Sequence, residues 1–230
     1  MWNRSELKSN AKLALKANYW KAVLVGLILS FILGSGSTAA QNSARSSTDG
    51  LTDIDPVMVF TVIGIILAAV FVAMVISILL SIFIWNPLEV GCQKFFINCK
   101  YGNAELGDIA YGFKNGYAHI GMFLRGLFTG LWMLLFIIPG IVKSYEYMMI
   151  PYLLAEHPEM TRQEAFAESK QMMDGNKWDA FVLDLSFIGW TLLGVCTFGI
   201  LLVFYVEPYI YLTRAELYHA LKNNNKSVEF

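Results

Sequence analysis

The sequence predicts an all-helical protein embedded in a membrane. Residues 57–85 contain no charged side chain and are rich in Ile, Val and Leu, and about 20 apolar residues already cross the hydrocarbon core of a bilayer. Of the 230 residues, 56% are hydrophobic and 15% are charged, whereas an ordinary soluble domain has about 25% charged residues. This length fits one membrane domain, residues 1–230.

Hydropathy and turn residues divide the chain into about six transmembrane helices, paired as three hairpins. We expect the first hairpin in residues 1–99, the second in 100–158, and the third with a polar tail in 159–230. The six expected legs are residues 20–36, 57–85, 118–138, 141–155, 178–196, and a last leg from 200. The return legs of the second and third hairpins are short, so one of these hairpins could re-enter rather than span.

A helix over residues 4–17 is predicted to lead into the first hairpin. Asn3 can cap it, with Glu6 as the reciprocal partner. One face is apolar and is formed by Leu7, Ala11, Ala14 and Leu15. A row of cations lies beside it, namely Arg4, Lys8, Lys12 and Lys16. This pattern is typical of an amphipathic helix at an anionic membrane surface.

The first hairpin then has a long outer connection. Residues 38–55 are mostly small and polar, which predicts a loop, and Pro56 is well placed at the start of the next helix. The second leg ends at Trp85-Asn86-Pro87, and residues 88–99 continue as a helix at the inner surface.

Leader helices are also predicted before the other two hairpins. Before the second, helical spacing relates Leu106, Ile109, Ala110 and Phe113. Before the third, Thr161 and Glu164 form a capping box, and Gly175 is a natural C-terminal stop. The buried side of this last helix is expected to hold Ala165, Phe166, Ser169, Met172 and Met173.

The sequence therefore predicts an internal repeat of three similar units. Each unit has a leader helix, an aromatic residue where the first leg begins, two legs joined by a turn, and a proline where the second leg ends, which we call the exit proline. The exit prolines are Pro87, Pro151 and Pro208. Lys and Arg concentrate in segments 1–21, 86–116, 156–177 and 213–230, whereas the outer loop holds only Arg45. Because basic residues favour the cytoplasmic side, both termini are predicted to be cytoplasmic.

Five charged residues fall within the predicted legs and form the candidate polar cluster: Arg125, Lys143, Glu146, Asp184 and Glu207. Charges at such depth are costly and are enriched at functional sites, but structural pairing and snorkelling near the interfaces are the favoured explanation. We expect Arg125 to pair with Asp184 between hairpins, and Lys143 to meet Glu146 on one helix face. Gly126 and Gly130 are spaced for close helix packing, most simply inside the monomer.

Catalytic residues, metal sites and cofactor sites are not predicted. The three histidines are scattered, and metalloprotease, nucleophile-elbow and phosphate-loop motifs are missing from the sequence. Cys92 and Cys99 share a helix face without further ligands nearby, so they are interpreted as small buried apolar residues. A net charge of −1 indicates no nucleic-acid partner.

Several motifs resemble a bacterial membrane family catalogued as domain of unknown function number nine hundred and seventy-five. They are the entry Leu15-Lys16-Ala17-Asn18-Tyr19-Trp20-Lys21-Ala22, then Phe187-Ile188-Gly189-Trp190, and Pro208-Tyr209 with Thr213-Arg214-Ala215-Glu216. The family usually has Gly where Ala17 stands. The resemblance is expected over nearly the whole chain and implies a multi-span protein of the bacterial cytoplasmic membrane, with no catalytic residues to transfer. A more distant likeness is to the membrane domain beside some glycerophosphodiester phosphodiesterases.

Three functions stay open at this point. The first is a non-catalytic protein that binds lipid or a partner membrane protein and regulates or assembles something. The second is a transporter or channel for ions or small solutes, which requires the five charges to converge on a wet cavity. The third, a lipid-modifying enzyme, ranks last because no nucleophile lies beside a base.

Overall fold

The computed structural model describes residues 2–42, 56–114, 116–197 and 199–226, and over these residues the chain is helical with no strand. The elements in order are α1 (Arg4–Ala17), α2 (Tyr19–Asn42), α3 (Pro56–Leu80), the π-helix η1 (Ser81–Trp85), α4 (Asn86–Cys99), the 3₁₀ helix η2 (Leu106–Lys114), α5 (Gly116–Leu135), α6 (Ile137–Glu146), α7 (Ile150–Glu156), α8 (Arg162–Met173), α9 (Lys177–Leu185), α10 (Ile188–Cys196), the π-helix η3 (Leu202–Val206) and α11 (Glu207–Lys226).

The hydrophobic core lies mainly in a base built from α1, η2, α4, α7, α8 and α11. Helices α4, α7 and α11 form its centre, where α4 packs against both of the others. Aromatic contacts tie these helices together: Tyr152 of α7 stacks on Tyr218 of α11, and Phe96 of α4 packs against Tyr211 of α11, with 5.5 Å between ring centroids in both pairs.

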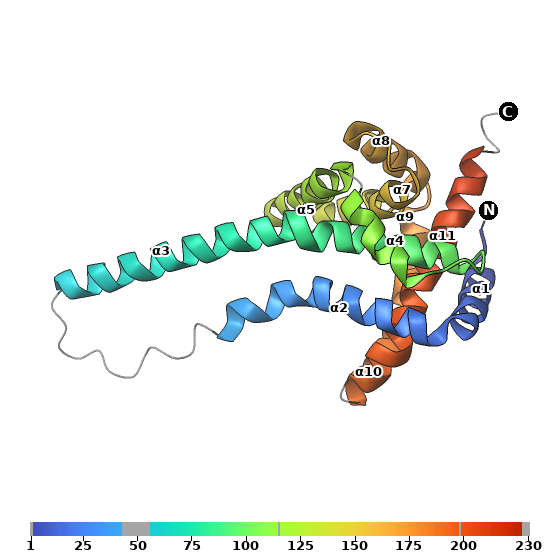
Figure 1. Ribbon diagram of the computed structural model, residues 1–230, viewed down its shortest axis with the longest axis horizontal. Coiled ribbons are helices and arrows are strands. Elements are labelled where there is room, and N and C mark those ends of the chain that lie inside the picture. The colour runs from blue at the N-terminus through green and yellow to red at the C-terminus, as the bar shows by residue number, and fades with distance from the viewer. Residues whose placement is uncertain (1, 43–55, 115, 198, 227–230) are drawn as a thin grey trace.

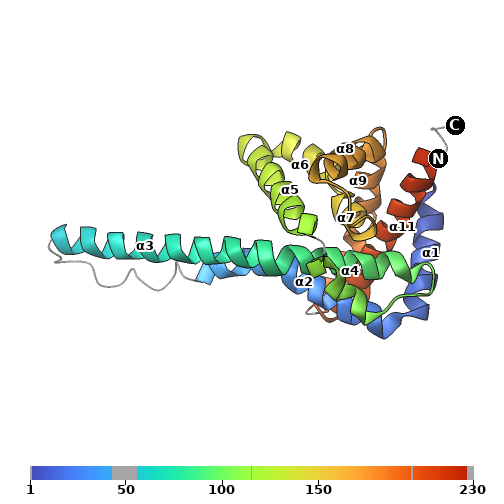
Figure 2. The same ribbon diagram turned by 45° about the horizontal axis from the view of Figure 1, so that its top comes forward.

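Around this centre, the leader helix of each hairpin packs on the helix that ends the preceding hairpin. Leader η2 packs on α4, leader α8 packs on α7, and leader α1 packs on α11. The last contact closes the order into a ring and places α1 beside α11, as both views show (Figures 1 and 2).

This arrangement changes the meaning of the amphipathic pattern in α1. Leu7, Ala11 and Leu15 are buried as predicted, but they face protein, because α1 lies against α11. The apolar stripe is therefore explained by packing in the base, without a membrane surface. Leader α8 behaves likewise, with Ala165, Ser169, Met172 and Met173 buried.

The contact between η2 and α4 is a backbone-to-backbone contact through two glycines. A Cβ added to Gly91 would lie 1.9 Å from the carbonyl oxygen of Ile109, and one added to Gly112 would lie 1.8 Å from that of Pro87. The segment was predicted as a helix from the spacing of Leu106, Ile109, Ala110 and Phe113. It is a 3₁₀ helix that exposes Leu106 and Phe113 and buries Gly112. A side chain on the packed face would have held the backbones apart.

Three apolar arms project from the base (Figures 1 and 2). Hairpin 1 comprises α2 and α3, hairpin 2 comprises α5 and α6, and hairpin 3 comprises α9, α10 and η3. Their outer parts expose large apolar side chains, and every side chain of α3 that the structure describes is exposed. Such surfaces are what a protein shows to hydrocarbon, so the burial pattern divides the molecule into a packed base and apolar arms.

The predicted exit prolines mark where these arms return to the base. Pro87, Pro151 and Pro208 each occupy the first turn of a base helix, namely α4, α7 and α11. Proline lacks an N–H and clashes with the carbonyl four residues earlier in a regular helix. The π-helices η1 and η3 immediately precede α4 and α11, and their wider register accommodates the proline within a continuous helix.

Within the residues that the structure describes, fewer than six segments meet the requirements for a membrane span. By length and composition, two helices could cross, Ile63–Cys99 and Lys177–Cys196, and the number rises to four if two bent helix pairs each count as one span. All-helical architecture is thus confirmed, whereas six transmembrane helices are not. The predicted fourth leg, 141–155, is divided between α6 and the buried α7.

Local signals were mostly confirmed. Thr161 and Glu164 form the reciprocal capping box, and Gly175 has a positive φ of 71° at the end of α8. Asn3 caps α1 by accepting a hydrogen bond from the backbone N–H of Ser5. The predicted outer loop 38–55 begins later than expected, because α2 continues to Asn42; its remainder, 43–55, lies outside the described residues.

Candidate functional site

The expected ion pair between Arg125 and Asp184 is wrong. Arg125 donates to the carboxylate of Glu89 on α4, at 2.9 Å, and joins hairpin 2 to the base. Asp184 instead accepts hydrogen bonds from Arg214 on α11, with Nη2 at 3.1 Å, and from the Tyr145 hydroxyl at 3.0 Å. The prediction paired these residues because they occupy matched positions in hairpins 2 and 3. In the structure, each of them instead contacts a helix of the base, α4 for Arg125 and α11 for Asp184.

The second predicted pair is present and has an additional member. Lys143 lies 2.7 Å from one carboxylate oxygen of Glu146, and Lys177 at the start of α9 lies 2.8 Å from the other. The Glu146 side chain is only 5% exposed, whereas the two lysine side chains are 27% and 28% exposed. This cluster joins hairpins 2 and 3 and carries one more positive than negative charge.

Glu207 is set apart from these clusters. Its Oε2 atom is buried and makes no hydrogen bond to any described residue. It opens α11 directly after η3. The five predicted residues are therefore distributed over three pairing groups and one separate carboxylate.

The predicted packing glycines face open space. A Cβ added to Gly126 or Gly130 would meet no heavy atom within 4 Å, so neither residue mediates close helix packing within the monomer. The glycines that permit close contact are Gly91 and Gly112 in the base, and Gly140 and Gly194 within hairpins 2 and 3.

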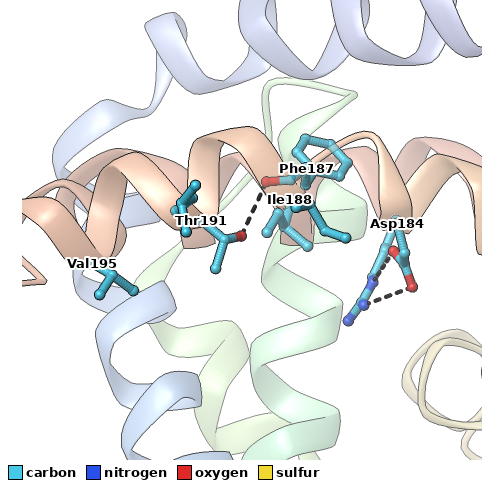
Figure 3. A pocket seen from close by; sticks show the side chains of 8 residues that line it. Asp184, Phe187, Ile188, Thr191 and Val195 are labelled. Carbon is cyan, nitrogen blue, oxygen red and sulfur yellow. Dashed lines mark hydrogen bonds and ion pairs between the residues drawn. The ribbon is translucent and has the colours of Figure 1, made fainter.

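A groove opens where hairpin 3 leaves the base, and we call it the hairpin 3 groove (Figure 3). Its volume is about 260 Å³, and it is lined by Asp184, Phe187, Ile188, Thr191, Leu192, Val195, Ile210 and Arg214. The Asp184–Arg214 pair lies at one end, and the rest of the wall is largely apolar. The Thr191 hydroxyl donates to the Phe187 carbonyl four residues earlier, at 3.1 Å, so this hydroxyl hydrogen is already used in a hydrogen bond to the backbone.

The basic row of α1 lies behind this groove. Arg4 pairs with Asp179 at 3.4 Å, while the Lys8 ammonium lies 4.5 Å from the centre of the Phe187 ring. Lys12 lies 5.7 Å from the centre of the Tyr209 ring. Three residues of the row predicted to face lipid headgroups therefore contact hairpin 3 and the first turn of α11.

A separate polar network lies in the base. The Glu156 carboxylate accepts hydrogen bonds from Tyr218 and Lys222 of α11. Burial raises the pKa of Glu156, but these two hydrogen bonds outweigh it and hold the pKa below its usual range. Burial also lowers the pKa of His219, which favours its neutral form. These groups stabilise the contact between α7 and α11 and lie outside the groove.

Sequence reasoning missed Glu89, Lys177 and Arg214, which pair with the predicted residues. Glu89 and Arg214 were placed in the helical continuations of the second and last legs, and Lys177 was placed at the entry to the fifth leg. Their positions carried a signal: Glu89 and Arg214 follow the exit prolines Pro87 and Pro208 within two turns. A charge within two turns of an exit proline is therefore close enough to pair with a charged residue of another hairpin, as Glu89 does with Arg125 and Arg214 does with Asp184.

The described residues include no group of three or more His, Cys, Asp or Glu side chains placed to hold a metal ion. Cys92 and Cys99 are buried, in agreement with their interpretation as small core residues, and Cys196 is exposed. The expectation that the protein binds no cofactor stays a prediction.

The fold and these sites together define a class: an all-helical protein with a packed base and apolar arms. Among the described residues, two helices could cross a membrane, or up to four if each bent helix pair counts as one span. Residues 117–225 match the family described as "Protein of unknown function (DUF975)". This match, which covers hairpins 2 and 3, supports the family that the motifs resembled. The entry motif at 15–22 lies outside it. No curated protein and no solved structure matches the chain.

Proposed function

We propose that this chain is an integral protein of the bacterial cytoplasmic membrane that binds an amphiphilic lipid without transforming it. The observation that carries the proposal is the hairpin 3 groove, whose apolar wall ends at the Asp184–Arg214 pair. A lipid has the same division, with an acyl chain that gains by leaving water and a polar head that needs hydrogen-bonding partners. A lipid-loaded chain could then regulate or assemble a partner membrane protein.

The transporter reading required the five charges to share one wet cavity. The structure divides them among separate partners on α4, α9 and α11. Each pairing also has a structural consequence, since it ties a hairpin to the base or to another hairpin. The proposal therefore follows the lipid-binding reading.

The groove proposal predicts that filling the groove reduces lipid binding. In a Thr191→Trp variant, the indole would occupy the apolar wall, and we expect the affinity for the lipid bound in this groove to fall about tenfold, which corresponds to about 1.4 kcal/mol. Native mass spectrometry of the full chain, released from mild detergent, measures this. The matched control is Leu134→Trp, which places the same side chain on hairpin 2 at a position 84% exposed. Equal lipid occupancy in both variants would contradict the proposal.

We also propose that only hairpin 1 crosses the bilayer and that both termini are cytoplasmic. Helix α3 has 25 residues, about 38 Å at ~1.5 Å per residue, which exceeds a hydrocarbon core of about 30 Å. Beyond the ion pair at Arg125, α5 continues only to Leu135, about 15 Å, and α6 has 10 residues. The segment Lys177–Cys196 is long enough to cross by its length and composition. However, Asp184 within it pairs with Arg214 of the base, so only residues 185–196, about 18 Å, extend beyond that ion pair. Hairpins 2 and 3 would therefore turn near the bilayer midplane.

Cys196 offers a native test of this depth, because it is exposed at the end of α10. We expect a membrane-impermeant maleimide, added from either side of intact membranes, to leave Cys196 unmodified and to modify it after denaturation in dodecyl sulfate. A cysteine placed at Ser47, with Cys196→Ser, should react from the outside and serves as the control. Labelling of Cys196 from outside would show that hairpin 3 crosses completely.

A further inference from the structure

A second groove lies between hairpins 2 and 3, along α6 and α9, and we call it the α6–α9 groove. Its volume is about 240 Å³, and it is lined by Ile138, Ile141, Val142, Tyr145, Lys177, Trp178 and Phe181. Phe181 is held between aromatic neighbours, with its ring centroid 6.0 Å from that of Tyr145 and 5.4 Å from that of Trp178. The groove thus has a rigid apolar wall that leads to a lysine.

The charges at the end of this groove do not balance. Glu146 uses one carboxylate oxygen for Lys143 and the other for Lys177, at 2.7 and 2.8 Å, so two ammonium groups share one carboxylate. An ammonium group has three N–H donors, and its bond to Glu146 uses one of them. The lysines keep partial exposure while the carboxylate is almost completely buried.

We infer that the α6–α9 groove binds an anionic phospholipid, with its phosphate at Lys143 and Lys177 and an acyl chain along Ile141, Val142 and Phe181. This inference rests on the proposed lipid-binding function but uses a groove of its own. The excess positive charge favours a phospholipid whose headgroup carries a phosphate but no cationic group. The ammonium of phosphatidylethanolamine would find the Glu146 carboxylate already paired on both oxygens, so selectivity follows from the charge count.

The hairpin 3 groove lacks this excess. Its Asp184 and Arg214 form a one-to-one pair, with the Tyr145 hydroxyl as a further donor. The hairpin 3 groove is lined mainly by α10 and α11, whereas the α6–α9 groove is lined by α6 and α9. They should therefore differ in headgroup preference.

The test is native mass spectrometry of the purified full chain, titrated with dioleoyl phosphatidylglycerol or dioleoyl phosphatidylethanolamine in the same detergent. We expect tighter binding of phosphatidylglycerol. Because each lysine near an anionic lipid surface contributes about fivefold in affinity, Lys177→Gln should weaken phosphatidylglycerol binding about fivefold and leave phosphatidylethanolamine unchanged. Glu146 keeps Lys143 in this variant, so its carboxylate is not left unpaired.

Two variants control the test. Lys177→Arg keeps the charge and should retain the preference. Lys170→Gln removes an exposed lysine from α8 that lines neither groove, and it should have no effect. Equal affinities for the two lipids, or an unchanged preference in Lys177→Gln, would overturn the inference. Displacement of the lipid by millimolar glycerol phosphate would also overturn it, since the site would then recognise phosphate alone.

The outcome separates this inference from the proposed function. If Thr191→Trp loses lipid while Lys177→Gln keeps the wild-type preference, the hairpin 3 groove binds lipid and the inference about the α6–α9 groove fails. If Lys177→Gln loses the preference and Thr191→Trp binds lipid normally, the inference stands and the hairpin 3 groove is not the lipid site.

Discussion

Replacing Gly112 by alanine is expected to lower the stability of the protein by about 3 kcal/mol, at the upper end of the usual range for overpacking. The new Cβ would lie 1.8 Å from the carbonyl oxygen of Pro87 and 2.7 Å from its carbonyl carbon. These are backbone atoms of the central helix α4, so no side-chain rotation can relieve the contact. The helix η2 must move away from α4, and the ring of leader helices opens at that point.

The measurement is thermal unfolding of the detergent-solubilised chain. For a protein of this size, each kcal/mol shifts the Tm by about 2–4 °C, so the Tm should fall by about 6–12 °C. Gly107→Ala is a matched control in the same 3₁₀ helix, because an added Cβ there meets nothing within 4 Å. If both variants melt at the wild-type temperature, the close contact between η2 and α4 does not exist.

Removing the guanidinium of Arg214 is expected to cost about 3 kcal/mol, because it leaves the Asp184 carboxylate with only the Tyr145 hydroxyl. We choose the low end of the range for breaking a buried ion pair, since the two side chains are 33% and 22% exposed. Replacing both residues by leucine should recover much of this loss, since no uncompensated charge remains. The expected coupling free energy between Arg214 and Asp184 is about 2 kcal/mol.

The same experiment on Arg125 and Asp184 tests which pairing the protein uses. These residues have separate partners, Glu89 and Arg214, and separate partners make mutational effects additive to within about 0.5 kcal/mol. Unfolding free energies of the wild type, the two single variants and the double variant in each cycle supply the comparison. Strong coupling of Asp184 to Arg125 but not to Arg214 would reverse the assignment made from the structure.

Patterns that act over one or two helical turns were predictable from the sequence. The capping box at Thr161 and Glu164, the stop at Gly175 and the exit prolines all occur where predicted. The pair Lys143–Glu146 was also predictable, because residues three apart share a helix face. These rules need only the helical repeat and the chemistry of neighbouring residues.

The candidate site was predicted less well. Four of the five charged residues form ion pairs, and Glu207 is a separate carboxylate. The predicted pairing of Arg125 with Asp184 was wrong, and their partners Glu89 and Arg214, together with Lys177, were missed. Gly126 and Gly130 have the spacing of a packing motif but no neighbouring helix to pack on. Spacing along one helix does not reveal which other helix lies opposite.

By itself, the sequence determined that this chain is helical, that its apolar residues are too many and too continuous for a soluble core, and where most helices begin and end. Those properties depend on solvent transfer and on local backbone geometry, which composition and spacing encode directly. Only the tertiary structure decided that the leader helices pack on the preceding hairpins, that α1 closes the ring on α11, and which charges meet. These outcomes depend on contacts between residues far apart in the chain, whose partners are set by the packing of whole helices.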